Sequence, residues 1–262
     1  MVIRTLTAED FDAVYAAFVE AFSDYVVKLR PSREQLLEML TRRGWVPEAS
    51  VGVFEGERMI AFTLNGLGEA SGYDSGTGVV LSHRRSGLAR QTMERSSVLL
   101  RERGCTRYVL EVIDSNAKAI ELYRGLGFKE KRGLQCWAFD GGPSEAKYDS
   151  ASPLPETEWD VEPAWQNSTA SVRRAKDTYT VIGDSDAYAI VFPSNGDLAQ
   201  FAVRREARRR GIGTQLLRQA AAVAGKPLRI MNIDERAEGI KHFFHALGAK
   251  RTVRQLEMVR NI

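Results

Sequence analysis

The stretch LEVIDSNAKAIELYRGLGF, residues 110–128, joins a strand to a helix through a short turn. Residues 106–113, TRYVLEVI, form an apolar run rich in β-branched side chains, which predicts a buried strand. Residues 115–126 carry apolar side chains at helical spacing and are followed by Gly127, a residue that commonly ends helices. A strand that leads directly into a helix indicates an α/β fold.

The elements around this stretch can be predicted in the same way. Thr7 begins a T-x-x-D pattern, which is typical of a helix start. The expected order is a strand at 2–6, helices from 8 and from 32, a hairpin over 49–66 that turns at Glu55–Gly56, a strand at 76–81, a helix over 87–103, the strand and helix of the opening stretch, and a strand at 134–139.

The order of elements partly repeats after a break in composition. Residues 141–163 contain four of the eight prolines, at positions 143, 153, 155 and 163, which predicts a linker. A hairpin over 178–192, a strand at 198–203, a helix over 211–224, a strand at 227–233, a helix over 235–248 and a strand at 254–260 follow.

Two motifs recur at nearly the same distance. Arg84-x-x-Gly87-x-Ala89 returns 124 residues later as Arg208-x-x-Gly211-x-Gly213. Leu-Gly-Phe at 126–128 returns 121 residues later as Leu-Gly-Ala at 247–249. We therefore expect a duplicated α/β unit with domains at 1–141 and 164–262, a linker at 142–163, and a trimmed second half.

Composition narrows the class of protein. The 262 residues are 44% hydrophobic and 27% charged, as expected for a soluble globular chain. The net charge of +3 is too small to indicate a nucleic-acid partner. No apolar run is long enough for a membrane helix and the first residues lack a signal core, so we expect a cytoplasmic protein without a membrane partner. Cys105 and Cys136 are expected to be buried thiols.

Both glycine motifs precede helices, and the start of a helix is a favourable place for an anion to bind. The first amides of a helix have no partner within the helix and its dipole is positive there, while neighbouring arginines add charge. A diphosphate would fit such a site. The motif lacks the Lys-Ser/Thr of a Walker loop, and Leu216 stands where a dinucleotide fingerprint has glycine. A helix with a solvated arginine face, or RNA binding through the arginines of 204–210, remains the alternative.

The first glycine motif, taken with the pattern Asn116-x-x-Ala119-x-x-Leu122-Tyr123-x-x-Leu126-Gly127-Phe128, resembles the Gcn5-related N-acetyltransferases, or GNAT family, which bind acetyl-coenzyme A (acetyl-CoA). The Leu-Glu-Val strand at 110–112 is similar to that of ribosomal-protein alanine acetyltransferases. The resemblance covers about 2–140 well and 176–260 loosely. It implies two tandem GNAT-like units, each with a mixed, mostly antiparallel sheet flanked by helices.

The resemblance also implies where the cofactor binds. The pyrophosphate would lie on the glycine loop, and the pantetheine arm would enter between two splayed central strands and reach Asn116. The implied cofactor residues are Val79, Val80, Leu81, Arg84, Arg85, Ser86, Gly87, Leu88, Ala89, Arg90 and Asn116, and in the second half Val203, Arg208, Arg209, Arg210, Gly211, Ile212 and Gly213.

Acetyl transfer from a thioester to an amine needs a base for the amine and an acid for the leaving thiolate. By resemblance, Glu111 is the base and Tyr123 the acid, with Asp74 as a second candidate base. Glu111 could instead be a strand-edge carboxylate, and Tyr123 a core aromatic. No metal is expected, because His242 and His245 lack a third ligand in the sequence.

The second half departs from the pattern. Phe244, Ala237 and Asn232 align with Tyr123, Asn116 and Glu111. We therefore expect the first half to be catalytic, while a catalytic second half or a non-catalytic acetyl-CoA-binding module stays open. The acceptor is a primary amine of a small molecule or protein, and the segment 23–31 is expected to line its site. The sequence allows a monomer or a homodimer.

Overall fold

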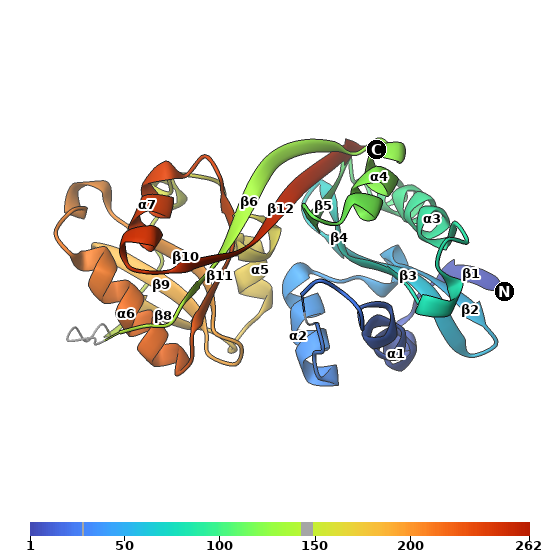
Figure 1. Cartoon of the computed structure of the whole chain (residues 1–262), viewed down its shortest axis with the longest axis horizontal. Coiled ribbons are helices and arrows are strands. Elements are labelled where there is room, and N and C mark those ends of the chain that lie inside the picture. The colour runs from blue at the N-terminus through green and yellow to red at the C-terminus, as the bar shows by residue number, and fades with distance from the viewer. Residues whose placement is uncertain (28, 143–148) are drawn as a thin grey trace. The chain divides into compact units, whose positions relative to one another are not determined.

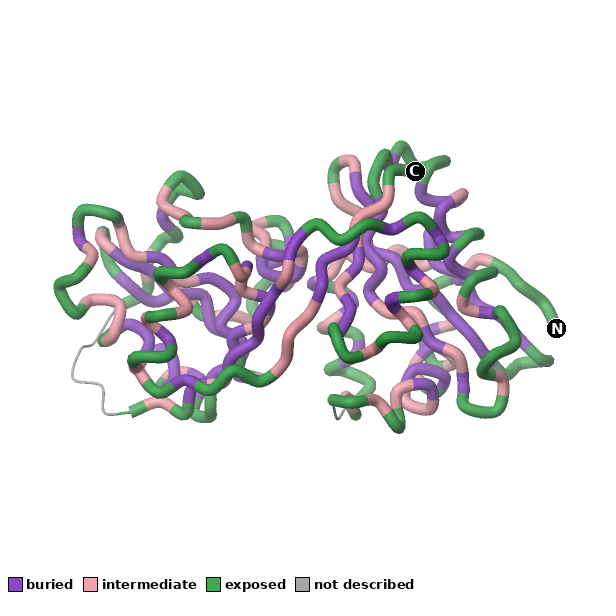
Figure 2. Tube along the Cα trace, turned by 45° about the horizontal axis from the view of Figure 1, so that its top comes forward, coloured by how far each residue is buried: buried purple, intermediate pink, exposed green. Residues whose placement is uncertain are grey.

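The computed structural model describes residues 1–27, 29–142 and 149–262, which form two compact units. The first unit consists of Met1–Lys131 and Glu257–Ile262, and the second unit consists of Arg132–Leu256. In Figure 2 the buried segments gather in the interior of each unit, and exposed segments surround them. Part of the predicted linker, 143–148, lies outside the described residues.

The first unit has a mixed sheet with helices on both faces, as predicted. Its elements are β1 Val2–Thr5, α1 Phe11–Ala21, α2 Arg33–Arg43, β2 Val51–Glu55, β3 Arg58–Leu67, β4 Ser71–Val79, α3 Leu88–Glu102, β5 Arg107–Ile113 and α4 Ala117–Gly125. Neighbouring strands from β1 to β4 are antiparallel, and β4 and β5 are parallel. Helices α1 and α2 cover one face, and α3 and α4 cover the other (Figure 1).

Local sequence signals explain how the first helices form. A capping box joins Thr7 to Asp10 ahead of α1, and another joins Ser32 to Gln35 at the start of α2. Apolar side chains of α1 then pack on β3 and β4, because their helical spacing puts them on one face. The resulting core includes Phe11, Val14, Phe18, Leu36, Leu40, Val53, Ile60, Phe62 and Leu64.

Strand β4 differs from its prediction. The predicted strand covered 76–81, whereas β4 spans Ser71–Val79 and Leu81 begins a 3₁₀ turn that ends at His83. The added residues, 71–75, are Ser-Gly-Tyr-Asp-Ser, which have low intrinsic strand propensity apart from the tyrosine. They form a strand because β3 and β5 pair with them on both sides.

The second unit repeats this plan in a shorter form. Its elements are β6 Lys129–Phe139, of which Arg132–Phe139 belong to this unit, β7 Asp149–Ser150, α5 Thr169–Arg174, β8 Thr180–Gly183, β9 Ala187–Phe192, β10 Asp197–Val203, α6 Ile212–Ala224, β11 Leu228–Asp234, α7 Glu238–Ala246 and most of β12 Lys250–Asn261. Alternate residues of β9 pack with α6 and with α5 on opposite faces. The short helix α5 was not predicted.

The compact units do not follow the order of the chain. Strand β6 comes at the end of the first repeat, yet it pairs with β11 of the second unit, where Trp137 lies opposite Ile230. The end of β12 belongs to the first unit, where the backbone N–H of Ile262 donates to Thr106 O over 3.0 Å. The domain boundaries proposed from the sequence follow chain order. In the structure, the second compact unit includes most of β6 from the first repeat, and the first unit includes the end of β12 from the second repeat.

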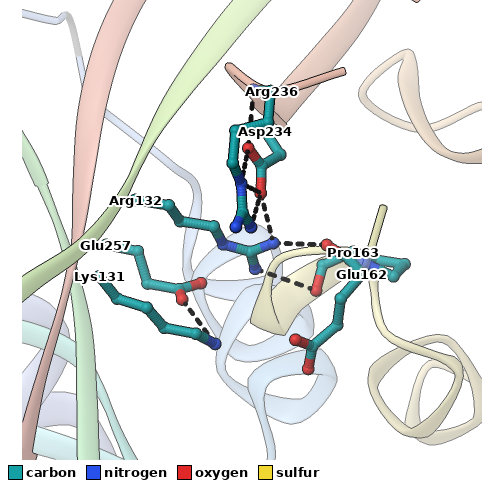
Figure 3. Close-up of polar contacts among 7 residues, drawn as sticks. All are labelled: Lys131, Arg132, Glu162, Pro163, Asp234, Arg236 and Glu257. Carbon is teal, nitrogen blue, oxygen red and sulfur yellow. Dashed lines mark hydrogen bonds and ion pairs between the residues drawn. The ribbon is translucent and has the colours of Figure 1, made fainter. Parts of the chain in front are cut away.

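A buried ion network holds the second unit together (Figure 3). Arg132 lies 3.1 Å from Asp234, and their side chains are 3% and 1% exposed. Arg132 also donates to the carbonyl oxygens of Glu162 and Pro163, at 2.6 and 3.4 Å. Burial raises the pKa of Asp234, but hydrogen bonds from Arg236 and Arg132 outweigh it and hold that pKa at about 2. The network joins β6, β11 and the segment before α5.

Figure 3 also contains an ion pair of the first unit, between Lys131 and Glu257 at 3.1 Å. The glutamate begins the C-terminal segment that belongs to this unit. The pair therefore joins that segment to the end of the unit's continuous part.

We predict that Arg132→Met lowers the free energy of unfolding by about 3 kcal/mol, because it removes one partner of a buried ion pair. Urea unfolding of the full chain measures the change. Lys250→Met is the control, since Lys250 and Asp140 form an exposed pair at 3.8 Å and such pairs contribute about 0–1 kcal/mol. Equal losses in the two variants would contradict the prediction.

Candidate active site

Strands β4 and β5 separate in the middle of the first unit. Their parallel pairing covers Ser71–Tyr73 and Arg107–Val109. Beyond these positions β4 continues to Val79 and β5 to Ile113, and the described residues form no further pairs between them. A bulge at Ser75, opposite the junction of Leu64 and Asn65, bends β4 at this place. The two strands therefore border a gap.

Two glycines identify which side chains face each side of the sheet. A Cβ on Gly66 would lie 2.1 Å from the carbonyl oxygen of Arg43 in α2, so Gly66 and its cross-strand partner Tyr73 face α2. A Cβ on Gly72 would lie 2.5 Å from Leu100 of α3. Side chains alternate along a strand, so Gly72 and Tyr73 face opposite sides.

Glu111 lies on the α2 side of the gap. Its Oε2 accepts a hydrogen bond of 3.0 Å from the hydroxyl of Tyr73. Burial, followed by the charge of Glu111, raises the pKa of Tyr73 well above its usual value, so this tyrosine remains a neutral donor. The contact explains how a carboxylate is held within the mainly apolar strand β5.

Tyr123 lies on the opposite side, in α4. Its ring packs edge-on against Phe128, and the residue is 8% exposed. Its hydroxyl has no hydrogen-bond partner among the described residues. Burial raises its pKa well above 10, and the charge of Asp74 raises it further. A tyrosine hydroxyl without a partner in the protein can donate a hydrogen bond to a ligand.

Asp74 lies on the same side as Tyr123. Its cross-strand partner is Asn65, whose side chain accepts a hydrogen bond from Tyr108. Since Tyr108 also contacts Met93 of α3, this side of the sheet is the one that faces α3. The carboxylate of Asp74 accepts hydrogen bonds of 2.9 Å from the N–H of Gly76 and from the hydroxyl of Thr77. Burial nevertheless raises its pKa to about 6.

We predict a pH-dependent stability difference between the wild type and Asp74→Asn. Because the folded-state pKa is raised, folding favours the protonated acid, and the stability from Asp74 falls as pH rises from about 4 to 6. Relative to Asp74→Asn, the wild type should lose about 2–3 kcal/mol over that range. Urea unfolding at pH 4 and pH 7 measures it, with the exposed Asp12→Asn as control. A constant difference would contradict the prediction.

The glycine loops share an uncommon backbone conformation. Arg85 and Gly87 have φ of +64° and +79°, and their counterparts 124 residues later, Arg209 and Gly211, have +66° and +84°. Positive φ is uncommon for arginine. Successive amides in such a conformation can form a concave anion-binding surface. The repeat predicted from the motifs therefore extends to individual backbone angles.

The arginines of the first loop differ in their surroundings. Arg84 donates to Asp24, and Arg90 donates to the carbonyl oxygen of Gly125. Among the described residues, no side-chain partner is found for Arg85. Of the other predicted cofactor residues, Val79 ends β4, Val80 and Leu88 are buried, Leu81 is exposed, Ser86 donates to the carbonyl oxygen of His83, and Ala89 lies in the first turn of α3.

Asn116 caps the helix that carries Tyr123. Its Oδ1 accepts from the N–H of Ala119 over 3.3 Å. Ala237 in the second unit has nearly the same backbone angles, φ −77° and ψ 62° against −85° and 68°, but no side-chain amide. The backbone is thus repeated without the polar group.

The second unit holds apolar or hydrogen-bonded side chains at the matching places. Phe244 is fully buried against Trp137, and Asn232 accepts a hydrogen bond from Cys136. Phe243 stacks on Phe201 with ring centroids 5.7 Å apart, and a Cβ on Gly213 would lie 3.4 Å from its ring. Arg208 in its loop donates to Asp160, while no side-chain partner of Arg209 or Arg210 is found among the described residues.

The model of the Acetyltransferase (GNAT) family matches residues 11–128 and 143–249. The chain belongs to the GNAT family. Two matches in one chain make it a tandem member with two GNAT units. No helix among the described residues is long and apolar enough to span a membrane.

Solved structures are similar over the whole chain. A GCN5-related N-acetyltransferase from Sphaerobacter thermophilus has 15% identity and a TM-score of 0.73, with 99% of this chain and 95% of that chain covered. A tandem GNAT protein from the clavulanic acid biosynthesis pathway has 15% identity and a TM-score of 0.67, covering 99% and 98%. These likenesses support the fold.

The ribosomal-protein-S18-alanine N-acetyltransferase from Escherichia coli is similar over 51% of this chain and 81% of its own length, with 25% identity and a TM-score of 0.44. No curated protein matches the sequence.

Sequence reasoning missed one tyrosine of this site. Tyr73 belongs to the part of β4 that was not predicted, and only its pairing with β3 and β5 brings it to Glu111. The contact leaves no spacing signal, because it arises from the packing of distant segments.

Proposed function

We propose that the first unit transfers an acetyl group from acetyl-CoA to a primary amine by direct attack on the thioester. The observation that supports this is the position of Glu111 and Tyr123 on opposite sides of the gap between β4 and β5. An amine that attacks from one side and a thiolate that leaves on the other need a proton acceptor and a proton donor in this arrangement.

Glu111 is the proposed base. Only a neutral amine attacks a thioester, so a carboxylate on the amine's side removes its proton, directly or through a water molecule. Asp74 is less suited to this role, since both its oxygens accept hydrogen bonds and it lies on the side of Tyr123. Its negative charge would instead help to keep Tyr123 protonated.

Tyr123 is the proposed acid. Its raised pKa keeps the hydroxyl protonated throughout the neutral range. The hydroxyl can therefore donate a hydrogen bond to the sulfur as negative charge develops there. The absence of any other partner among the described residues leaves that hydrogen available.

Acetyl-CoA is the cofactor that fits the first loop. A Cβ on Gly87 would meet nothing closer than Gln91 at 3.8 Å, so the loop is open to a diphosphate. Arg85 and the first amides of α3 would bind it. The arm would run along Thr77–Leu81 toward Asn116. Acetyl-CoA supplies the activated acyl group, and the side chains named above orient it and move protons.

We further propose that only the first unit turns over. Phe244 has no proton to donate, Asn232 is not a base, and Ala237 has no amide. Phe201 and Phe243 fill space beside the second loop. The second loop could still bind a diphosphate. The alternative to an enzyme is a protein that binds acetyl-CoA without catalysis, and turnover of any amine would exclude that alternative.

Tyr123→Phe should reduce kcat by about 100-fold or more, since it removes the proton donor and little volume. Thiol release from acetyl-CoA is followed with a panel of primary amines: an Ala-starting peptide, a lysine peptide, spermidine and an aminoglycoside. The Kd for acetyl-CoA should change by less than about threefold, because the donor acts on developing charge. Tyr179→Phe is the control, and an unchanged kcat in Tyr123→Phe would contradict the proposal.

Gly87→Glu and Gly211→Glu form a matched pair. Both glycines have similar positive φ, and a Cβ at either position meets no backbone, so the cost to folding should be similar. A carboxylate at Gly87 should abolish turnover and tight binding by repelling the diphosphate, whereas Gly211→Glu should retain turnover. Calorimetric titration of acetyl-CoA and the rate assay measure both. Activity lost only in Gly211→Glu would assign catalysis to the second unit.

A further inference from the structure

Tyr73 joins the two strands of the proposed site at the place where their backbone pairing ends. It is the last residue of β4 in the parallel register, where its partner on β5 is Val109. Its hydroxyl donates to Oε2 of Glu111, two residues further along β5, over 3.0 Å. A side-chain hydrogen bond therefore continues the connection between the strands on the α2 side of the gap.

This contact needs a long and well-fixed side chain at position 73. Two residues of a strand span about 7 Å, so the hydroxyl of a serine or threonine there would not reach Glu111. Tyr73 is 2% exposed, and side chains in a packed interior keep to a low-energy rotamer. The tyrosine thus offers a fixed donor to a carboxylate on a more flexible side chain.

The end of α2 holds the backbone around Tyr73. The neighbour of Tyr73 on β3 is Gly66, and a Cβ there would lie 2.1 Å from the carbonyl oxygen of Arg43. Arg43 also donates to the carbonyl oxygen of Ser75, the bulged residue of β4, over 3.0 Å. The helix end therefore contacts both β3 and β4 beside Tyr73, which fixes the place from which its ring extends toward β5.

The charged side chains that act on the Tyr73 hydroxyl come from different elements: Glu111 from β5, Arg43 from the end of α2 and Asp74 from β4. Burial is the largest cause of the raised pKa of Tyr73. The charges of Glu111 and Asp74 raise that pKa further, and the charge of Arg43 opposes them. The hydroxyl therefore keeps its hydrogen over the range in which a glutamate titrates, and the ionised carboxylate is the form that it binds best.

We propose that Tyr73 is a positioning residue for acetyl transfer, which orients the carboxylate of Glu111 on the acceptor side and keeps it ionised. The inference rests on the proposed function of the first unit. A base that removes a proton from a bound amine has to be both oriented and unprotonated. The hydroxyl of Tyr73 serves both needs by acting on Glu111, without contacting the amine or the thioester.

Tyr73→Phe removes the donor and keeps the ring. In the protein without cofactor, the Glu111 carboxyl should titrate about one pH unit higher in this variant than in the wild type, because a hydrogen bond to the charged form is lost. Carbon-13 NMR of protein labelled at the glutamate carboxyl groups measures the titration, and Glu111→Gln identifies the signal.

Tyr188→Phe is the matched control for this titration. It removes the hydroxyl of another fully buried tyrosine, which belongs to the second unit and donates to Gln200 over 3.0 Å. The Glu111 signal should titrate in this variant as it does in the wild type. An unshifted titration in Tyr73→Phe would overturn the proposal.

The rate profile tests the same contact during turnover. With the best amine of the panel, Tyr73→Phe should lower kcat about tenfold at neutral pH and move the acid limb of the profile to higher pH. The Kd for acetyl-CoA should change by less than about twofold, because Tyr73 lies on the acceptor side. The amine is the same in both proteins, so a shift between the profiles comes from the enzyme. A profile that is lowered without a shift would contradict the proposal.

A double-mutant cycle separates positioning from direct catalysis. In a Glu111→Gln background, Tyr73→Phe should reduce the remaining rate by less than about twofold, because Tyr73 acts through Glu111. The rates are compared at about pH 9, where a larger share of the amine is already neutral. An equal loss in both backgrounds would show that Tyr73 acts on the substrate itself, and would overturn the proposal.

The titration and the rates distinguish this inference from the proposed function. A shifted Glu111 titration in a protein that acetylates no amine would support the role of Tyr73 in setting the charge of Glu111, and the proposed function would be the part that failed. An unshifted titration in an active enzyme would overturn the inference and leave acetyl transfer by the first unit intact.

Discussion

The separation of β4 and β5 is the constraint on which the rest of the first unit depends. Paired strands satisfy each other's backbone hydrogen bonds. Because β4 and β5 separate after Tyr73 and Val109, their facing backbone N–H and C=O groups beyond these residues are left for another partner. An extended ligand with amide groups, such as a pantetheine arm, can supply those hydrogen bonds. In the proposed mechanism, the same separation lets a side chain of one face, Glu111, and a side chain of the other, Tyr123, act on one ligand.

The two units show which parts of this arrangement tolerate change. Both keep the left-handed residue pair of the glycine loop, the 3₁₀ turn before it and the start of the following helix. The side chains differ: Phe244 and Asn232 stand where the first unit has Tyr123 and Glu111. The backbone conformation of the loop and helix start is therefore the same in both units although the side chains differ, whereas proton transfer depends on individual side chains.

Two buried carboxylates illustrate how environment sets charge. Asp234 is surrounded by two arginines, which hold its pKa at about 2 and make it a permanent structural anion. Asp74 receives only neutral donors in direct contact, and burial raises its pKa to about 6. The first arrangement stabilises a fold. The second is typical of places where a protein uses charge for function.

The sequence alone determined the α/β class, the duplication and most elements, because these follow from local periodicity, capping residues and glycines whose positive φ is encoded by residue type. The motifs also led to the family and to Glu111 and Tyr123. Only the tertiary structure decided the start of β4, the assignment of the ends of β6 and β12 to different compact units, and the contact of Tyr73 with Glu111. These depend on segments far apart in the chain, whose pairing leaves no periodic trace in the sequence.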